Sequence, residues 1–201
     1  MNLKKSEWLL IIFNLVYLIG FSWFYVKQDN WEFLLYIGVI IVVFVLILAT
    51  IKKTKFNNFV LWGLSIWGLA HMLGGGLMIG DHVLYKQMIY TFIQSGEMSI
   101  LKFDQVVHIY GFFIMTVVGY YLLLPHLKKK VNWKVIYFLL VMVGMGFGAF
   151  NEVAEFVATL IMPESGVGGY INTSLDLVSN LIGSILAVLF IEFGLRRRNL
   201  K

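Results

Sequence analysis

The sequence predicts an all-α, polytopic integral membrane protein with six transmembrane helices. Of its 201 residues, 60% are hydrophobic and 13% are charged, and the mean hydropathy is +0.83, whereas soluble domains carry about 25% charged residues. Six apolar runs are each long enough to cross a hydrocarbon core, which takes about 20 residues. The two prolines, Pro125 and Pro163, each sit at the end of such a run, where they disturb a helix least.

We expect these runs to form one transmembrane domain over residues 1–201. The runs cover residues 8–26, 33–51, 58–80, 105–125, 135–162 and 173–195. The first run follows Lys4 and Lys5, as a signal peptide would, but no small-residue cleavage site follows it. We therefore interpret it as a retained span. Trp8, Trp31 and Trp133 lie near predicted span ends, as interfacial aromatic residues do.

The basic residues set the expected orientation, because lysine and arginine are held back on the cytoplasmic side of a membrane. All but three of the 16 lysines and arginines fall on the side that carries both chain ends; the exceptions are Lys27, Lys86 and Lys102. We therefore expect both termini in the cytoplasm and a multi-pass protein of the cytoplasmic (plasma) membrane. The expected partners are membrane lipids, and the composition excludes a nucleic-acid-binding protein.

The longest connection, residues 81–103, is expected on the outer side. Its apolar stretch, residues 83–93, is too short to span a membrane and could lie at the interface as a helix. Within the spans, Gly144 and Gly148, and the series Ser179, Gly183 and Ala187, are typical of close helix packing in membranes.

Polar residues gather in the last four spans. Ionisable groups inside a membrane are costly and are candidates for function. The first two spans have none in their interiors, whereas spans three to six carry His71, Asp104, His108, Asn151, Glu152, Glu155, Asp176 and Asn180. By their distance from the span ends, all of these lie in the outer half of the membrane. We therefore expect spans three to six to form the core bundle around a polar site that faces outward.

The spacing of these residues indicates a shared site. The pairs Asp104 and His108, and Asp176 and Asn180, are four residues apart, and Glu152 precedes Glu155 by three, so each pair shares one helix face. Histidine and carboxylate groups that converge from several helices are typical of metal sites in bundles. The candidate metal ligands are His71, Asp104, His108 and Asp176; the candidate catalytic groups are Glu152 and Glu155; Asn151 and Asn180 complete the polar site.

The donor types restrict the cofactor without identifying it. The chain has no cysteine, so thiolate metal sites and disulfides are excluded. Nitrogen and oxygen donors suit one divalent ion such as zinc, manganese, iron or magnesium. One glutamate could then bind the ion while the other acts as a general base.

A second interpretation explains the same residues without a ligand. An unpaired carboxylate at a helix centre costs about 2.5–3.5 kcal/mol on insertion scales, so these groups must be paired, protonated, hydrated or metal-bound. A hydrogen-bonded polar plug between helices would satisfy them. Three functions stay open: an enzyme, with or without a metal, that acts on a lipid or lipid-linked substrate; a transporter or proton-linked carrier; and a non-catalytic membrane partner or scaffold. The apolar inner halves of the last four spans weigh against transport.

Four short motifs follow one another in the chain. They read His71-Met-Leu-Gly-Gly, Phe103-Asp104-Gln-Val-Val-His108, Asn151-Glu152-Val-Ala-Glu155, and Asn172-Thr-Ser-Leu-Asp176-Leu-Val-Ser-Asn180 with Gly183. Their order resembles the YjdF-like family of predicted inner-membrane proteins over roughly residues 60–190. That family has no established biochemical role, so the resemblance implies the fold and the position of the polar cluster and implies no activity.

Overall fold

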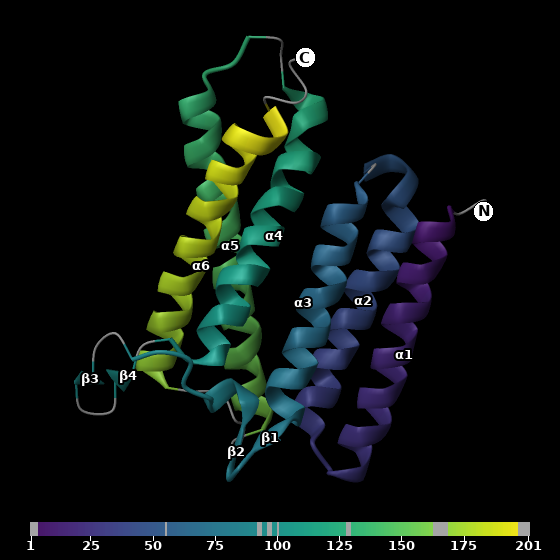
Figure 1. Ribbon diagram of the computed structural model, residues 1–201, viewed down its shortest axis with the longest axis vertical. Helices are drawn as coiled ribbons and strands as arrows, with labels where there is room; N and C mark the ends of the chain where they lie inside the picture. Colours follow the sequence, from purple (N-terminus) through teal and green to yellow (C-terminus); the bar gives the residue numbers. More distant parts are fainter. Residues whose placement is uncertain are drawn as a thin grey trace.

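Long helices make up most of the described part of the chain, as Figure 1 shows for its computed structural model. The structure describes residues 4–54, 56–91, 94–95, 98–99, 101–127, 130–162 and 169–196. Within these residues, each of the six helices is long and apolar enough to cross a membrane, which confirms the predicted fold class. Pro163 and six of the basic residues behind the orientation prediction lie outside the described residues: Lys55, Lys128, Lys129, Arg197, Arg198 and Lys201.

The helix bounds follow the predicted spans closely. The helices are α1 (Lys5–Lys27), α2 (Trp31–Thr54), α3 (Asn58–Gly76), α4 (Phe103–Leu123), α5 (Trp133–Ile161) and α6 (Tyr170–Phe190). A 3₁₀ turn, η2 (Leu124–His126), continues α4, and a π-helical turn, η3 (Ile191–Arg196), continues α6. Side chains of Asn57 and Asn132 cap the starts of α3 and α5 by accepting backbone N–H groups of Val60 and Lys134.

The connection between α3 and α4 differs from the expectation. The third span ends at Gly76 and not near residue 80, because the chain turns into the hairpin of β1 (Met78–Ile79) and β2 (His82–Val83). Gly80 has a φ of 64°, which the tight turn needs. An interfacial helix over residues 83–93 is wrong for the described part, where β2 leads into a 3₁₀ turn, η1 (Leu84–Lys86). A second hairpin joins β3 (Gln94–Ser95) to β4 (Met98–Ser99).

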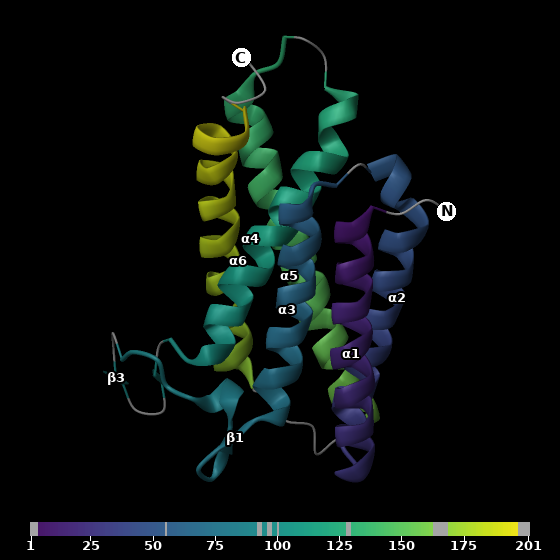
Figure 2. The same ribbon diagram turned by 45° about the vertical axis from the view of Figure 1, so that its right-hand side comes forward.

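The two ends of the molecule are distinct. Both chain ends, the α2–α3 connection and the α4–α5 connection lie at one end, called here the basic end, and both hairpins lie at the other, called the hairpin end (Figures 1 and 2). This placement agrees with an even number of spans. That the basic end faces the cytoplasm stays a prediction.

Helices α4, α5 and α6 form one half of the molecule, with α4 packed most extensively on α6. A Cβ atom at Gly183 of α6 would meet the backbone of α4 at Ile109 and Phe113, and a Cβ atom at Gly148 of α5 would meet the side chain of Asn180. Glycine at these positions lets the helices approach closely, as the small-residue spacing predicted. A fully buried apolar cluster that includes Val117, Leu140 and Ile191 joins this half to α3.

Helices α1, α2 and α3 form the other half. Tyr25, Phe33 and Met72 pack between them, and the Tyr25 hydroxyl donates a hydrogen bond to the Met72 carbonyl. Helix α2 is the most peripheral: 6% of the residues in its most apolar 18-residue stretch are buried, against 56% in the corresponding stretch of α4. Helix α3 packs against both α1 and α4, and it therefore links the two halves. Helix α2 has few buried residues.

Candidate functional site

His108 lies at the centre of a polar cluster between α4, α5 and α6 near the hairpin end. Its side chain is buried, and its Nδ1 atom lies 2.9 Å from Oδ1 of Asn180 on α6. The same Nδ1 atom lies 3.9 Å from Oε1 of Glu152 on α5, and Nε2 lies 3.8 Å from Oδ1 of Asp104 one turn earlier on α4. Both ring nitrogens thus face acceptor oxygens, on opposite sides of the imidazole.

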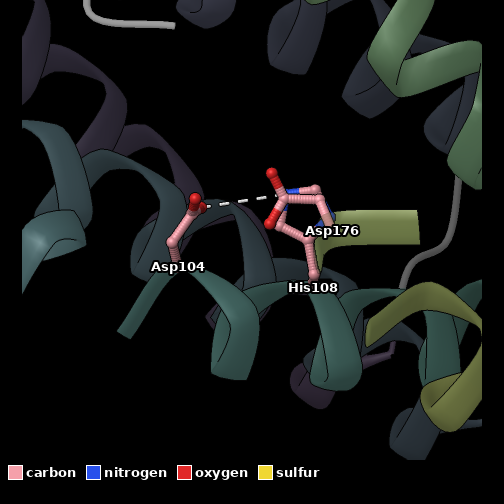
Figure 3. A group of neighbouring side chains, drawn as sticks. All are labelled: Asp104, His108 and Asp176. Carbon is pink, nitrogen blue, oxygen red and sulfur yellow. Dashed lines mark ion pairs between the residues drawn. The ribbon is translucent and has the colours of Figure 1, made fainter. Parts of the chain in front are cut away.

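Asp176 is fully buried and holds two hydrogen bonds from amide groups. The Gln105 side chain donates to Oδ1 over 3.0 Å, and the Asn172 side chain donates to Oδ2 over 2.6 Å. Gln105 is itself fixed, because its Oε1 accepts the backbone N–H of Lys102 at the start of α4. Figure 3 shows Asp104 and His108 projecting from α4 beside Asp176 of α6.

Glu152 differs from the other carboxylates of the cluster. Its side chain is 9% exposed, and neither carboxylate oxygen has a hydrogen-bond partner among the described residues. The Nδ2 atom of the neighbouring Asn180 is also buried without a partner there. An unpaired buried polar group costs about 1–3 kcal/mol, and a charged one costs more. The closest charged group that the described residues offer this carboxylate is the His108 ring, 3.9 Å away.

Two sets of potential ligand atoms share His108. Asp104, His108 and Asp176 offer one set, and His108, Glu152 and Glu155 offer the other; within each set all ligand atoms lie within 4.8 Å of one another. Among the described residues, the ion pairs of the cluster join His108 to Asp104 and to Glu152. No lysine or arginine of the described residues forms an ion pair with these carboxylates. Four carboxylate side chains thus lie around one histidine, and imidazole and carboxylate groups are donors that divalent cations bind.

Glu155 and Asn151 lie on the α5 face next to Glu152. The Asn151 side chain donates a hydrogen bond of 2.8 Å to Oε1 of Glu155. Both residues also line a cavity on the side of α5 that faces α2 and α3. Glu155 thus lies at the boundary between the polar cluster and this cavity.

The structure places His71 apart from the other candidate ligands. It belongs to neither set of converging ligand atoms. Its Nδ1 atom lies 2.5 Å from the hydroxyl of Tyr85, and its ring centroid lies 5.4 Å from that of Tyr36 on α2. Burial raises the pKa of the Tyr85 phenol well above its ordinary value, so this phenol stays protonated beside His71. His71 lines the same cavity as Glu155, on its opposite wall.

Three residues of the site escaped the sequence-based assignment. Gln105 and Asn172 hold Asp176, and Tyr85 holds His71. A glutamine directly after Asp104 in an apolar run was a usable signal for Gln105, and Asn172 lies four residues before Asp176 on one helix face. No local signal identifies Tyr85, because it reaches His71 from the 3₁₀ turn after the first hairpin.

Six candidate spans, three of which enclose a buried histidine and carboxylate cluster, define a polytopic membrane protein with a polar site among its helices. The family described as "Predicted membrane protein (DUF2238)" matches residues 9–197, so the chain belongs to this family. No curated protein and no solved structure matches the chain.

Proposed function

We propose that the chain is a membrane-embedded enzyme that binds one divalent cation in the His108 cluster and acts on a lipid or lipid-linked substrate. The buried carboxylate of Glu152, whose oxygens accept no hydrogen bond from the described residues and which lies 3.9 Å from His108, carries this proposal. The donors that surround it are imidazole and carboxylate groups, which suit zinc and similar ions. We also propose that the chain is related to the YjdF-like family of predicted inner-membrane proteins, whose order of motifs it resembles.

The residues around the cluster have distinct proposed roles. His108 and Glu152 would hold the cation together with Glu155, whose ligand atom converges with theirs; Asp104 and Asp176 offer a separate set with His108. With the cation bound at Nε2, Nδ1 would stay in contact with Asn180, which would orient the imidazole, as partners of metal-bound histidines do. A bound cation would polarise a substrate oxygen or activate a water. Glu155, held by Asn151 at the edge of the cavity, is placed to exchange a proton with a substrate.

The transporter alternative needs a polar route to the basic end. Instead, the apolar cluster of Val60, Val117, Leu140, Ala187 and Ile191 is fully buried between the polar site and that end. The enzyme proposal needs access from one side only. With the basic end placed in the cytoplasm by its lysines and arginines, we propose that the site faces the outer leaflet of the cytoplasmic membrane.

The polar plug remains the second candidate, and a specific observation favours it. Asp176, Asn172, Gln105 and Lys102 form a connected set of hydrogen bonds that needs no ligand. A plug of this kind accounts for Asp176, whereas the Glu152 carboxylate accepts no hydrogen bond from any described residue.

The metal content of the purified protein tests the proposal. After purification without chelators and equilibration with zinc and manganese, we expect about one equivalent of metal per chain. Glu152→Gln and His108→Ala should each lose most of it, while Glu7→Gln, at the basic end of α1, should retain it. If the unaltered protein holds no metal, or if Glu152→Gln holds as much as Glu7→Gln, the metal-dependent enzyme is ruled out.

A further inference from the structure

A cavity of about 170 Å³ lies beside the polar cluster, on the other side of α5. Four helices line it: α1, α2, α3 and the part of α5 near the hairpin end. On α3 the lining residues are at positions 61, 64, 65, 67, 68 and 71, and on α2 they run from Tyr36 to Ile47. At a rise of 1.5 Å per residue, both walls extend about 15 Å along the membrane normal.

The cavity opens toward the membrane. Val39 and Val43 of α2 line it, yet they are 50% and 45% exposed. These positions lie within a span that has few buried residues. An apolar space that opens sideways within the hydrocarbon core can receive only apolar molecules of the bilayer, because water and polar solutes are excluded there.

Polar groups occupy fixed places on the cavity wall. Near its middle, Asn14 donates to Ser65 over 2.7 Å and accepts from the Tyr17 hydroxyl, so these groups satisfy one another. At the end nearer the hairpins, His71 and Glu155 face the space from α3 and α5. Glu155 also belongs to the ligand set of His108 and Glu152. The cavity therefore leads from an apolar body to one edge of the polar cluster.

From this geometry we infer that the cavity binds the hydrocarbon chain of a membrane lipid, which enters sideways past α2. The hydrocarbon chain of the lipid lies along α3, and the polar head of the lipid lies at Glu155, beside the His108 cluster. This inference rests on the proposed function in one respect, since the lipid it places is the substrate of that site. A chain held in a preformed apolar cavity also explains how a single-leaflet site selects an amphiphile.

Photolabelling by a lipid tests the inference. The protein is placed in phosphatidylglycerol vesicles that contain a trace of phosphatidylglycerol with a diazirine near the end of one acyl chain. We expect label on Leu61 and Ser65, which are buried and which line the cavity. Lipid-facing residues such as Val42 and Val153 supply the background signal from bulk lipid.

Two matched variants separate the cavity from the general lipid surface. Ile40 lines the cavity, whereas its neighbour Ile41 is exposed and does not. Ile40→Trp should reduce the label on Ser65 roughly tenfold, because the larger side chain would fill part of the cavity that the lipid chain occupies. Ile41→Trp should leave that label unchanged. Unaltered protein without label on Leu61 and Ser65, or equal labelling in both variants, overturns the inference.

The same samples distinguish failure of the inference from failure of the proposed function. Glu152→Gln should lose the metal and keep the label on Ser65, because it does not line the cavity. Label on Ser65 in a protein that binds no metal would retain the lipid chain site and remove the metal-dependent enzyme. Bound metal without label on Ser65 would do the reverse.

Discussion

The two faces of α5 present different environments at the same membrane depth. On one face, α4, α5 and α6 pack so closely that Gly148 and Gly183 have no room for a Cβ atom, and polar groups are held in a fixed network. On the other face, α2 leaves a cavity that opens toward lipid. The polar groups between α4, α5 and α6 are thus buried where glycines let these helices approach closely. The side of α5 that faces α2 is less closely packed and keeps an open space.

Glu155 is the residue that these two environments share. It lines the cavity and also belongs to a set of ligand atoms with His108 and Glu152. Tight packing on one side preorganises donors, and the open side would admit the lipid that we propose. A site with this division can keep its polar groups in place while its substrate exchanges with the membrane.

The largest expected effect comes from breaking the tight side. Gly183→Leu would place a side chain against the α4 backbone at Ile109 and Phe113. Because backbone cannot move aside as a flexible side chain can, we expect destabilisation of about 3 kcal/mol or more. Gly146→Leu is the matched control, since a Cβ atom there meets nothing within 4 Å. Thermal unfolding in detergent should separate the two, and similar melting of both would contradict the packing described.

A bound cation should sharpen the contrast between the two sides. Zinc at a hundredfold excess over its dissociation constant stabilises the folded protein by about 2.7 kcal/mol. Hydrogen exchange should slow at the hairpin ends of α4, α5 and α6, because the proposed ligands lie there. Helix α2 should exchange at its original rate. Protection spread evenly over all helices would indicate nonspecific binding.

Two buried asparagines test whether the polar cluster is more than a structural feature. Asn180→Ala removes the partner of His108 Nδ1, and Asn14→Ala removes a partner of Ser65 and Tyr17. Each should cost about 1–3 kcal/mol of stability. Only Asn180→Ala should also weaken metal binding, by roughly 10- to 100-fold, because it orients a ligand. If the cluster were only a plug, calorimetric titration would give the same zinc affinity for Asn180→Ala as for Asn14→Ala.

The smallest effect is expected outside the membrane-spanning helices. The side chain of Asp81 is 99% exposed, and a hydrogen bond with His82 holds the pKa of this carboxyl below its usual range. Since the pair contacts neither the cluster nor the cavity, Asp81→Asn should change the melting temperature by less than about 1 °C. Metal content should stay unchanged; a loss would mean that the first hairpin takes part in the site.

The sequence predicts the helices well because a membrane span is a long, local signal. Hydropathy located all six, and spacing of three or four residues placed Asp104 with His108 and Asp176 with Asn180. The hairpin at Gly80 was missed because its strands are two residues long and give no periodic pattern.

The neighbours of each helix face could not be predicted in the same way. His71 shares a face of α3 with Leu61, Ser65 and Gly68, and that spacing is visible in the sequence. Which helix meets this face depends on the packing of Gly63 and Gly111 between α3 and α4, which turns His71 toward Tyr36 and the cavity. A metal role for His71 therefore receives no support from its position, whereas the roles of Asp104, His108 and Asp176 as ligands stay predictions.

X-ray absorption at the zinc edge tests the central claim, a cation bound at His108, most directly. In the zinc-loaded protein, we expect nitrogen and oxygen ligands at about 2.0–2.2 Å, imidazole scattering and no sulfur. His108→Ala should remove the imidazole signal, whereas His71→Ala should retain it, because His71 lies outside both ligand sets. Loss of the signal in His71→Ala alone, or zinc without imidazole scattering in the unaltered protein, would contradict the account.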